Sequence, residues 1–334
     1  MKHINKIVLL STLISLGLVG CNKQGNNSSS QSHASDHECG DCSVPAFHTQ
    51  PLGLKVAAPA GSPAIALFAH ISESTVEINA AENVQGYMTD AADKDMVILP
   101  TNYGVNAIVN KGVGFKLAAT VTFGNFFLLS TGSDADKTLN EGDKVLAFQQ
   151  NGVAGKLFNY IYGDKNLNTT YLGDAKAVKD AILTGGESFN YDYVLLAQPV
   201  VNVILQKKTS YAMYANIQEE YKTKTGGKEI TQASIFVKNS ADVTKVKAAL
   251  ATIKSDVEQL LNNHQEVIDQ TKNLEEEVVS AKFTATAQAV RGLLDNNNQL
   301  GIGYKDAFEN KSNIDSFLQS LGMGATNEEI YFRS

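Results

Sequence analysis

The sequence has no tryptophan and almost no arginine: Arg291 and Arg333 are the two arginines among 334 residues. Bidentate capture of a phosphate, sulfonate or carboxylate group is therefore disfavoured at any site that Arg291 does not reach. An aromatic clamp would have to consist of tyrosine or phenylalanine side chains. The formal net charge of -7 argues against a nucleic-acid partner, because a surface that binds nucleic acid needs a basic patch.

Cysteine is also scarce, and the first of the three cysteines follows an apolar run. Lys2 and Lys6 precede Ile7–Val19, which is too short to span a bilayer. The run ends in Leu-Val-Gly-Cys21, which resembles the lipobox of bacterial lipoproteins. This pattern predicts a signal peptide over residues 1–20 and a lipid (palmitate) anchor on Cys21 at the extracytoplasmic face of the cell membrane. An ordinary secretory leader with a chance cysteine is the alternative.

Residues 21–51 are predicted to form a flexible tether, because residues 22–35 are polar and without periodicity. The other two cysteines lie in this segment, where the spacing Cys39-Gly-Asp-Cys42 is that of half a zinc site. His33 and His37 are near them. No second CxxC follows, so no metal site is predicted, and these four residues stay weak metal candidates. A small surface disulfide or a plain tether are the alternatives.

The rest of the chain is long enough for two medium-sized domains. The hydrophobic content of the whole sequence, 43%, is that of an ordinary globular protein. A short strand from Leu52 breaks at Pro59-Ala-Gly-Ser-Pro63, and a helix is expected from Ala64, with Ser62 as its N-cap and Gly61 allowing close approach of a ligand. His70 is expected to cap the C-terminus of that helix.

The same alternation continues along the chain. Residues 84–95 are expected to be helical. The apolar run Met96–Leu99 is expected to be a strand that leads into the polar turn 100–104 and a further helix. The strands expected at Lys144–Phe148 and Tyr193–Ala197 are followed by Gln149-Gln-Asn-Gly152 and Gln198. Later, residues 242–277 show helical spacing with a break near Asn262. Alternating strands and helices predict an α/β fold with a parallel, helix-flanked sheet.

Five segments in this order resemble the substrate-binding lipoproteins of ABC importers, of the nitrate/sulfonate/taurine and thiamine-pyrimidine-precursor group: the lipobox, Pro59–Pro63, Ile98–Asn102, Val145–Gln150 and Tyr193–Pro199. The resemblance implies an α/β fold of the type II periplasmic-binding-protein kind, with two lobes of mostly parallel sheets joined by two crossover strands. Mapped onto this chain, lobe one would be residues 52–128 and 238–334, and lobe two residues 129–237.

Ligands bind at the carboxyl ends of strands in such sheets. The candidate ligand-binding residues are Gly61, Ser62, Thr101, Asn102, Tyr103, Phe123, Asn125, Gln149, Gln150, Asn151 and Gln198. Hydroxyls, amides and two aromatic rings suit a neutral or weakly charged organic solute, with heteroaromatic molecules among the candidates. The alternatives are that Asn102 caps its helix, that Phe123 belongs to the core and that Gln198 is a turn residue.

The function that the resemblance implies is delivery of a small solute to an ABC permease and its ATPase by a monomeric, lipid-anchored protein without a cofactor. No Ser/His/Asp or Cys/His set stands at plausible turns, so no enzyme activity is predicted. Two alternatives stay open. One is a surface lipoprotein that binds metal through its His/Cys tail. The other is an enzyme related to pyrimidine synthesis on the same fold, although the cysteine-rich iron-binding segment of such relatives is missing from the globular part.

Overall fold

The computed structural model describes residues 50–132, 138–186 and 189–333. The predicted signal peptide, the lipidation site Cys21 and the metal candidates His33, His37, Cys39 and Cys42 lie outside the described residues. Within the described ranges, no helix combines the length and the apolar character that crossing a membrane requires.

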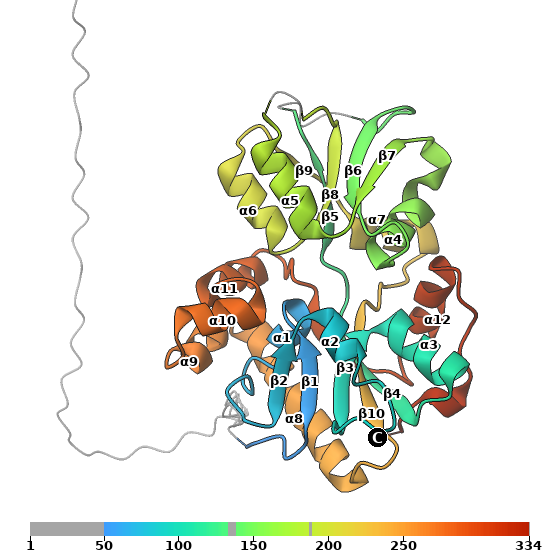
Figure 1. The fold of residues 1–334 in the computed structure, drawn as a ribbon, viewed down its shortest axis with the longest axis vertical. Coiled ribbons are helices and arrows are strands. Elements are labelled where there is room, and N and C mark those ends of the chain that lie inside the picture. Colours follow the sequence, from blue (N-terminus) through green and yellow to red (C-terminus); the bar gives the residue numbers. More distant parts are fainter. Residues whose placement is uncertain (1–49, 133–137, 187–188, 334) are drawn as a thin grey trace, which may run out of the picture. The chain divides into compact units, whose positions relative to one another are not determined.

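The first of two sheets has six strands in the order β11-β4-β10-β3-β1-β2 (Figure 1). Its strands are β1 (Val56–Pro59), β2 (Val76–Asn79), β3 (Met96–Pro100), β4 (Phe115–Thr122), β10 (Ala233–Lys238) and β11 (Ile302–Asp306). Its central strands β1, β3 and β10 are buried on both faces and are apolar at most positions, whereas the edge strands β2 and β11 carry polar residues. In β1, for example, Val56 and Ala58 belong to one core and Ala57 to another.

Helices cover both faces of this sheet. On the side of Val56 pack α1 (Ser62–Ile65), α8 (Val243–Asn262), α9 (Glu266–Thr271), α10 (Glu276–Phe283) and α11 (Ala287–Asp295). On the side of Ala57 pack α2 (Ala81–Gln85), α3 (Thr101–Lys111) and α12 (Lys311–Ser320), with a 3-10 turn at Glu328–Ile330. The predicted break near Asn262 is confirmed, because α8 ends there.

The second sheet has five strands in the order β7-β6-β8-β5-β9. They are β5 (Phe126–Ser130), β6 (Lys144–Phe148), β7 (Asn168–Leu172), β8 (Tyr193–Ala197) and β9 (Ala212–Asn216). The helices of this part are α4 (Val153–Tyr162), α5 (Ala175–Thr184), α6 (Val200–Lys207) and α7 (Ile217–Thr225), with a 3-10 turn at Gly163–Lys165. Asp174 caps α5 by accepting the N–H of Ala177 at 2.7 Å.

The predicted α/β class is confirmed, but both sheets are mixed rather than mostly parallel. The strands β10 and β5 run antiparallel to their neighbours on both sides. These two strands follow the segments 123–125 and 226–232, through which the chain crosses from one sheet to the other. The expected lobe boundaries at 128/129 and 237/238 therefore fall inside β5 and inside β10.

Three local expectations differ from the structure. Gly61, not Ser62, is the N-cap of α1, which ends after four residues, and Ser62 makes no capping hydrogen bond. Thr101 is already helical, so the expected polar turn is the first turn of α3. The helix expected over 84–95 is wrong beyond Gln85, where α2 ends. Residues 89–95 contain three aspartates, and Asp90 bonds the N–H of Gly114 instead of continuing a helix.

His70 is buried in an ion cluster rather than capping a helix. Its Nδ1 lies 2.6 Å from Glu73 Oε1, and its Nε2 lies 2.8 Å from Oδ2 of the buried Asp256 on α8. Burial opposes charge on the imidazole, but the hydrogen bonds from Asp256 and Glu73 outweigh it and raise the pKa of His70 above its ordinary value of 6.5.

This cluster predicts a pH-dependent stability. A raised pKa stabilises the folded chain fully below pH 6.5, and the contribution is lost as the pH rises through the higher folded value. We expect the free energy of unfolding to fall above about pH 6.5, by at most about 1.4 kcal/mol per pH unit. Urea unfolding between pH 6 and 9 measures this slope, and His70→Gln should remove it. An equal slope in the variant would assign it to other groups.

Candidate functional site

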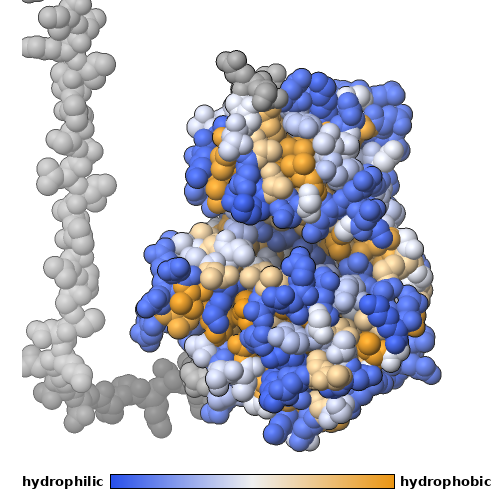
Figure 2. Space-filling view, in the orientation of Figure 1, coloured by the Kyte–Doolittle hydropathy of each residue, from blue (hydrophilic) through white to orange (hydrophobic). Residues whose placement is uncertain are grey.

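The carboxyl ends of strands from both sheets face each other across a cleft, and Figure 2 shows the surface hollowed there. From the first sheet, β3 ends at Pro100 and leads directly into α3. From the second sheet, β6 ends at Phe148 and leads through a short turn into α4. Parallel strands place such turns at one edge of their sheet. The two edges enclose cavities that residues from both parts of the chain line.

The first of these we call the tyrosine cavity, which has a volume of about 640 Å³. Its lining residues are Ala81, Glu82, Gln85, Pro100, Asn102, Tyr103, Gln149, Gln150, Asn151, Gly152, Val153, Tyr171, Leu172 and Gly173. Five of the predicted residues therefore meet here: Asn102 and Tyr103 from α3, and Gln149, Gln150 and Asn151 from the turn after β6.

Local backbone geometry explains the position of the turn after β6. Gln149 has a φ of 52°, in the left-handed region, and its N–H donates to Leu172 O at 2.9 Å. Gly155 lies in the first turn of α4, close to this turn. A Cβ atom on Gly155 would lie 2.5 Å from Gln149 O. The glycine thus lets the exposed amides of Gln149 and Gln150 stand at the mouth of the cavity.

Tyr171 at the end of β7 is a lining residue that the sequence reasoning missed. Its hydroxyl donates to Asn159 Oδ1 at 2.8 Å. Burial raises the pKa of Tyr171, and the hydrogen bond to Asn159 opposes that shift without cancelling it, so the phenol stays protonated at neutral pH. A signal for it is present in the sequence, because the β-branched and aromatic run Thr169-Thr-Tyr-Leu172 is typical of a strand and strand ends carry ligand contacts.

A second group of residues forms what we call the polar bridge: the predicted Ser62, Asn125 and Gln198, together with Gln232 and Gln299. Asn125 is 6% exposed, and its Nδ2 lies 3.1 Å from both Ser62 Oγ and Gln198 O. Gln232 Nε2 donates to Asn125 Oδ1 at 3.2 Å, and Gln198 Nε2 donates to Gln299 Oε1 at 2.7 Å. The bridge therefore links both crossing segments with loops of both sheets.

Gln232 and Gln299 were not predicted. Gln232 precedes β10 at the end where Ala233 pairs with Pro100, and Gln299 precedes β11. Because β10 is antiparallel to β3, its amino end lies at the cleft edge, and the rule based on carboxyl ends does not find it.

Two buried acceptors at the cleft have no hydrogen-bond partner among the described residues: Asn102 Oδ1 and Gln232 Oε1. The two residues are neighbours, because Thr101 N donates to Gln232 O at 3.0 Å. An unpaired buried acceptor costs about 1–3 kcal/mol. A bound molecule with N–H or O–H groups would satisfy both atoms. Asn102 makes no capping bond for α3, so its alternative interpretation has no support here.

Three predicted residues belong neither to the tyrosine cavity nor to the polar bridge. Thr101 is fully buried, and its hydroxyl lies 2.7 Å from Ser234 Oγ beneath the cleft. The N–H of Gly61 donates to Lys282 O at 3.0 Å, so this amide is not available to a ligand. Phe123 lies against Gly303 and 5.5 Å below the Lys305 ammonium, in a separate cavity of about 370 Å³.

Gln198 of the polar bridge also lines a larger cavity of about 840 Å³, which we call the carboxamide cavity. Besides Gln198, its lining residues are Pro199, Asn202, Val203, Leu205, Gln206, Met213, Ser280, Thr284, Ala285, Thr286, Gln288, Ala289, Gly292, Leu293, Asn296 and Gln299. No ionisable side chain is in this set. In the tyrosine cavity, Glu82 is the one ionisable group besides the two tyrosines. Neither of these two cavities therefore offers a cation to pair with an anionic ligand.

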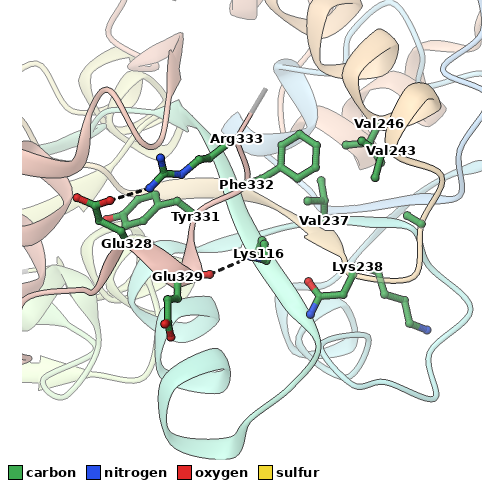
Figure 3. A pocket seen from close by; sticks show the side chains of 12 residues that line it. Lys116, Val237, Lys238, Val243, Val246, Glu328, Glu329, Tyr331, Phe332 and Arg333 are labelled. Atoms are coloured by element: carbon green, nitrogen blue, oxygen red, sulfur yellow. Dashed lines mark hydrogen bonds and ion pairs between the residues drawn. The ribbon is translucent and has the colours of Figure 1, made fainter.

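A cavity of about 600 Å³ lies at the other end of the first sheet (Figure 3). Val237 of its lining pairs with Met96, the first residue of β3, so this cavity is remote from the cleft. Its charged side chains are bonded to the protein: Lys116 Nζ donates to Glu329 O at 3.1 Å, and Arg333 pairs with Glu328 at 2.7 Å. Across the described ranges, no cluster of His, Cys, Asp and Glu could hold a metal ion.

The fold is that of periplasmic binding proteins. An ABC transporter protein from Parabacteroides distasonis has a TM-score of 0.64 at 17% identity, over 84% of this chain and 98% of that one. The aliphatic sulphonate binding protein SsuA from Escherichia coli has a TM-score of 0.57 at 13% identity, over 85% and 97%. The zinc-bound ligand-binding component of an ABC-type import system from Staphylococcus aureus has 0.58 at 9%, over 84% and 96%.

No protein-family model matches the sequence, and no curated protein matches it either. The resemblance to sulfonate-binding proteins of ABC importers is confirmed at the level of the fold, by the solved structures.

Proposed function

We propose that this chain is an extracytoplasmic solute-binding protein that captures a small, uncharged organic solute in its cleft and delivers it to an ABC permease. The observation that carries the proposal is the pair of unpartnered buried acceptors, Asn102 Oδ1 and Gln232 Oε1, at a cleft where uncharged polar side chains from both sheets meet. The similar folds of importer components support the same function.

In this proposal the two sheets are the centres of two lobes, which exchange chain at residues 123–125 and 226–232. A solute that contacts both lobes favours the closed arrangement, because it has fewer contacts when the lobes separate. The lipid on Cys21 would hold the protein at the membrane, and residues 21–51 would be its tether. The proposed action is binding without catalysis, and the solute class excludes sulfonates because neither the tyrosine cavity nor the carboxamide cavity offers them a cation.

The test is a solute screen on the full-length protein. Protein purified from its host is examined by native mass spectrometry for a retained molecule, then unfolded, stripped and refolded. Pyrimidines, flavin precursors, amino acids and alkyl sulfonates are compared by thermal shift. A solute at 100 times its Kd adds about 2.7 kcal/mol of stability, which raises Tm by roughly 5–10 °C in a protein of this size. No retained molecule and no shift across the screen would reject the function.

A substitution in the polar bridge tests whether the bridge supports both stability and solute binding. Asn125→Leu keeps a side chain that branches at Cγ but removes its hydrogen-bonding atoms, which leaves Ser62 Oγ, Gln198 O and Gln232 Nε2 without their partner. We expect a loss of about 2–3 kcal/mol in unfolding free energy, measured by urea titration, together with loss of the retained solute.

The matched control is Asn110→Leu on the exposed end of α3. The Nδ2 of Asn110 bonds only Asn106 Oδ1 among the described residues, so its loss should change stability by no more than about 0.5 kcal/mol and leave the solute bound. Equal effects of the two variants would contradict the role given to the bridge.

A further inference from the structure

The carboxamide cavity is the largest of the described cavities that both lobes line, and its chemistry is unusually uniform. Six carboxamide side chains line it. They are Gln198, Asn202 and Gln206, on and before α6, and Gln288, Asn296 and Gln299, on and after α11. Figure 1 shows α6 and α11 at the same side of the cleft, on opposite lobes.

The cavity adjoins the polar bridge through one contact. Gln198 is 4% exposed, its Oε1 accepts the N–H of Asn202 at 3.2 Å, and its Nε2 donates to Gln299 Oε1. The amide of Gln198 is therefore fixed in orientation by both lobes. A carboxamide presents two N–H donors and a carbonyl acceptor, so a wall of them complements another amide group in either orientation.

The apolar part of the lining is aliphatic, and the hydroxyls of Ser280, Thr284 and Thr286 add to its polar part. Val203, Leu205 and Met213 come from the second lobe, and Leu293 comes from α11. No aromatic ring lines the cavity, so nothing there stacks on a flat heteroaromatic molecule. No ionisable group lines it either, so a buried carboxylate or ammonium would lose its hydration without a counter-charge. The lining favours a neutral ligand in which amide groups alternate with saturated carbon.

We propose that the carboxamide cavity is the specificity subsite of the cleft and takes an uncharged molecule with secondary amide groups beside a branched aliphatic part, such as a capped short peptide. This inference deepens the proposed function and rests on it, because the cavity opens on the same cleft and shares Gln198 with the bridge. It shifts the substrate class from the flat heteroaromatic molecules that the sequence suggested to flexible amides.

Gly292 on α11 offers a variant that fills the cavity without damaging the fold. A Cβ atom at Gly292 would have no neighbour within 4 Å, and its backbone is helical. Replacing a helical glycine with a larger residue also removes its entropic cost. Gly292→Phe therefore places a ring in the cavity. The matched control is Gly163→Phe at the end of α4, where a Cβ likewise meets nothing within 4 Å and no described cavity is lined.

The probes are N-acetyl-L-leucinamide and N-acetyl-L-leucine, which differ in one group: a neutral amide against a carboxylate. Binding to the stripped full-length protein is measured by calorimetry at pH 7. We expect the amide to bind at least about tenfold more tightly than the acid, and Gly292→Phe to weaken the amide at least about tenfold, with Gly163→Phe equal to wild type. Equal binding of both probes, or no binding of the amide to wild type, would overturn the inference.

The solute retained by wild-type protein separates this inference from the proposed function. If Gly292→Phe binds that solute as tightly as wild type does, the carboxamide cavity is not its subsite, although the protein is still a solute-binding protein. If the variant loses the solute and the control keeps it, the subsite is supported.

Discussion

Gly104→Ala is expected to destabilise the protein by about 1–3 kcal/mol or more, although it adds a single methyl group. A Cβ atom on Gly104 would lie 2.1 Å from Cζ of Phe236 and 2.4–2.5 Å from two further ring atoms. Phe236 is fully buried in β10 and has no space into which its ring could withdraw. The helix α3 would have to move away from the sheet. Urea unfolding measures the loss.

The same displacement should reach the cleft. Asn102 and Tyr103 lie in the first turn of α3, two residues and one residue before Gly104, so they move with the helix. Misplacing one hydrogen bond to the solute is worth about 1.4 kcal/mol, so we expect its affinity to fall about tenfold. Calorimetry with the retained solute checks this.

A double variant separates the steric cause from a general helix effect. In Gly104→Ala with Phe236→Leu, the ring atoms that collide with the new methyl group are gone, so part of the lost stability should return as a coupling energy of about 0.5–3 kcal/mol. Val109→Ala, on the exposed side of α3, is the control and should change stability by about 0.5 kcal/mol or less. Strict additivity of the two core substitutions would show that the methyl group and the ring do not meet.

Phe317→Ala is expected to cost about 3–5 kcal/mol, because it removes a fully buried ring. Phe317 and Leu321 pack in the core of the second sheet, whereas Ile314 and Leu318 of the same helix pack in a core of the first sheet. The helix α12 thus fastens one lobe to the other. Hydrogen bonds reinforce it: Tyr221 OH lies 3.0 Å from Ser316 Oγ, and Lys156 Nζ lies 3.2 Å from Leu321 O.

This placement predicts a difference between neighbouring residues. Leu318→Ala should cost about 2–5 kcal/mol through the first core, but only Phe317→Ala should loosen α12 from α4 and α7. Hydrogen exchange of the amides in α4 and α7 measures that loosening. Gln319→Ala, which is exposed, is the control for both. A cost below about 1 kcal/mol for Phe317→Ala would contradict the packing of α12 between two cores.

Single residues show which cleft positions follow from reading the sequence. Gln149, Gln150 and Asn151 were predicted because an apolar strand and an amphipathic helix bracket them, and a short loop between such elements lies at a strand end. Asn102 and Tyr103 followed from the same pattern after β3. Ser62 was placed at the cleft, but as a cap, because its partner Asn125 is 63 residues away in sequence.

The residues that reasoning missed have their roles set by distant partners. Gln232 lies at the cleft because β10 returns antiparallel between β3 and β4, which no local pattern indicates. His70 ends in an ion cluster because α8, 186 residues later, brings Asp256 to its ring. The carboxamide cavity forms between α6 and α11. Both are ordinary amphipathic helices, and nothing in their sequences indicates that they face each other.

The sequence alone determined the α/β alternation, the strand ends that would carry polar loops and the scarcity of arginine for an anionic ligand, because periodicity and composition can be read without knowing the fold. Only the tertiary structure decided which loops meet, which amides are already paired with one another and which acceptors are left without a partner. Those outcomes depend on contacts between segments far apart in the chain, and such contacts leave no periodic trace in the sequence.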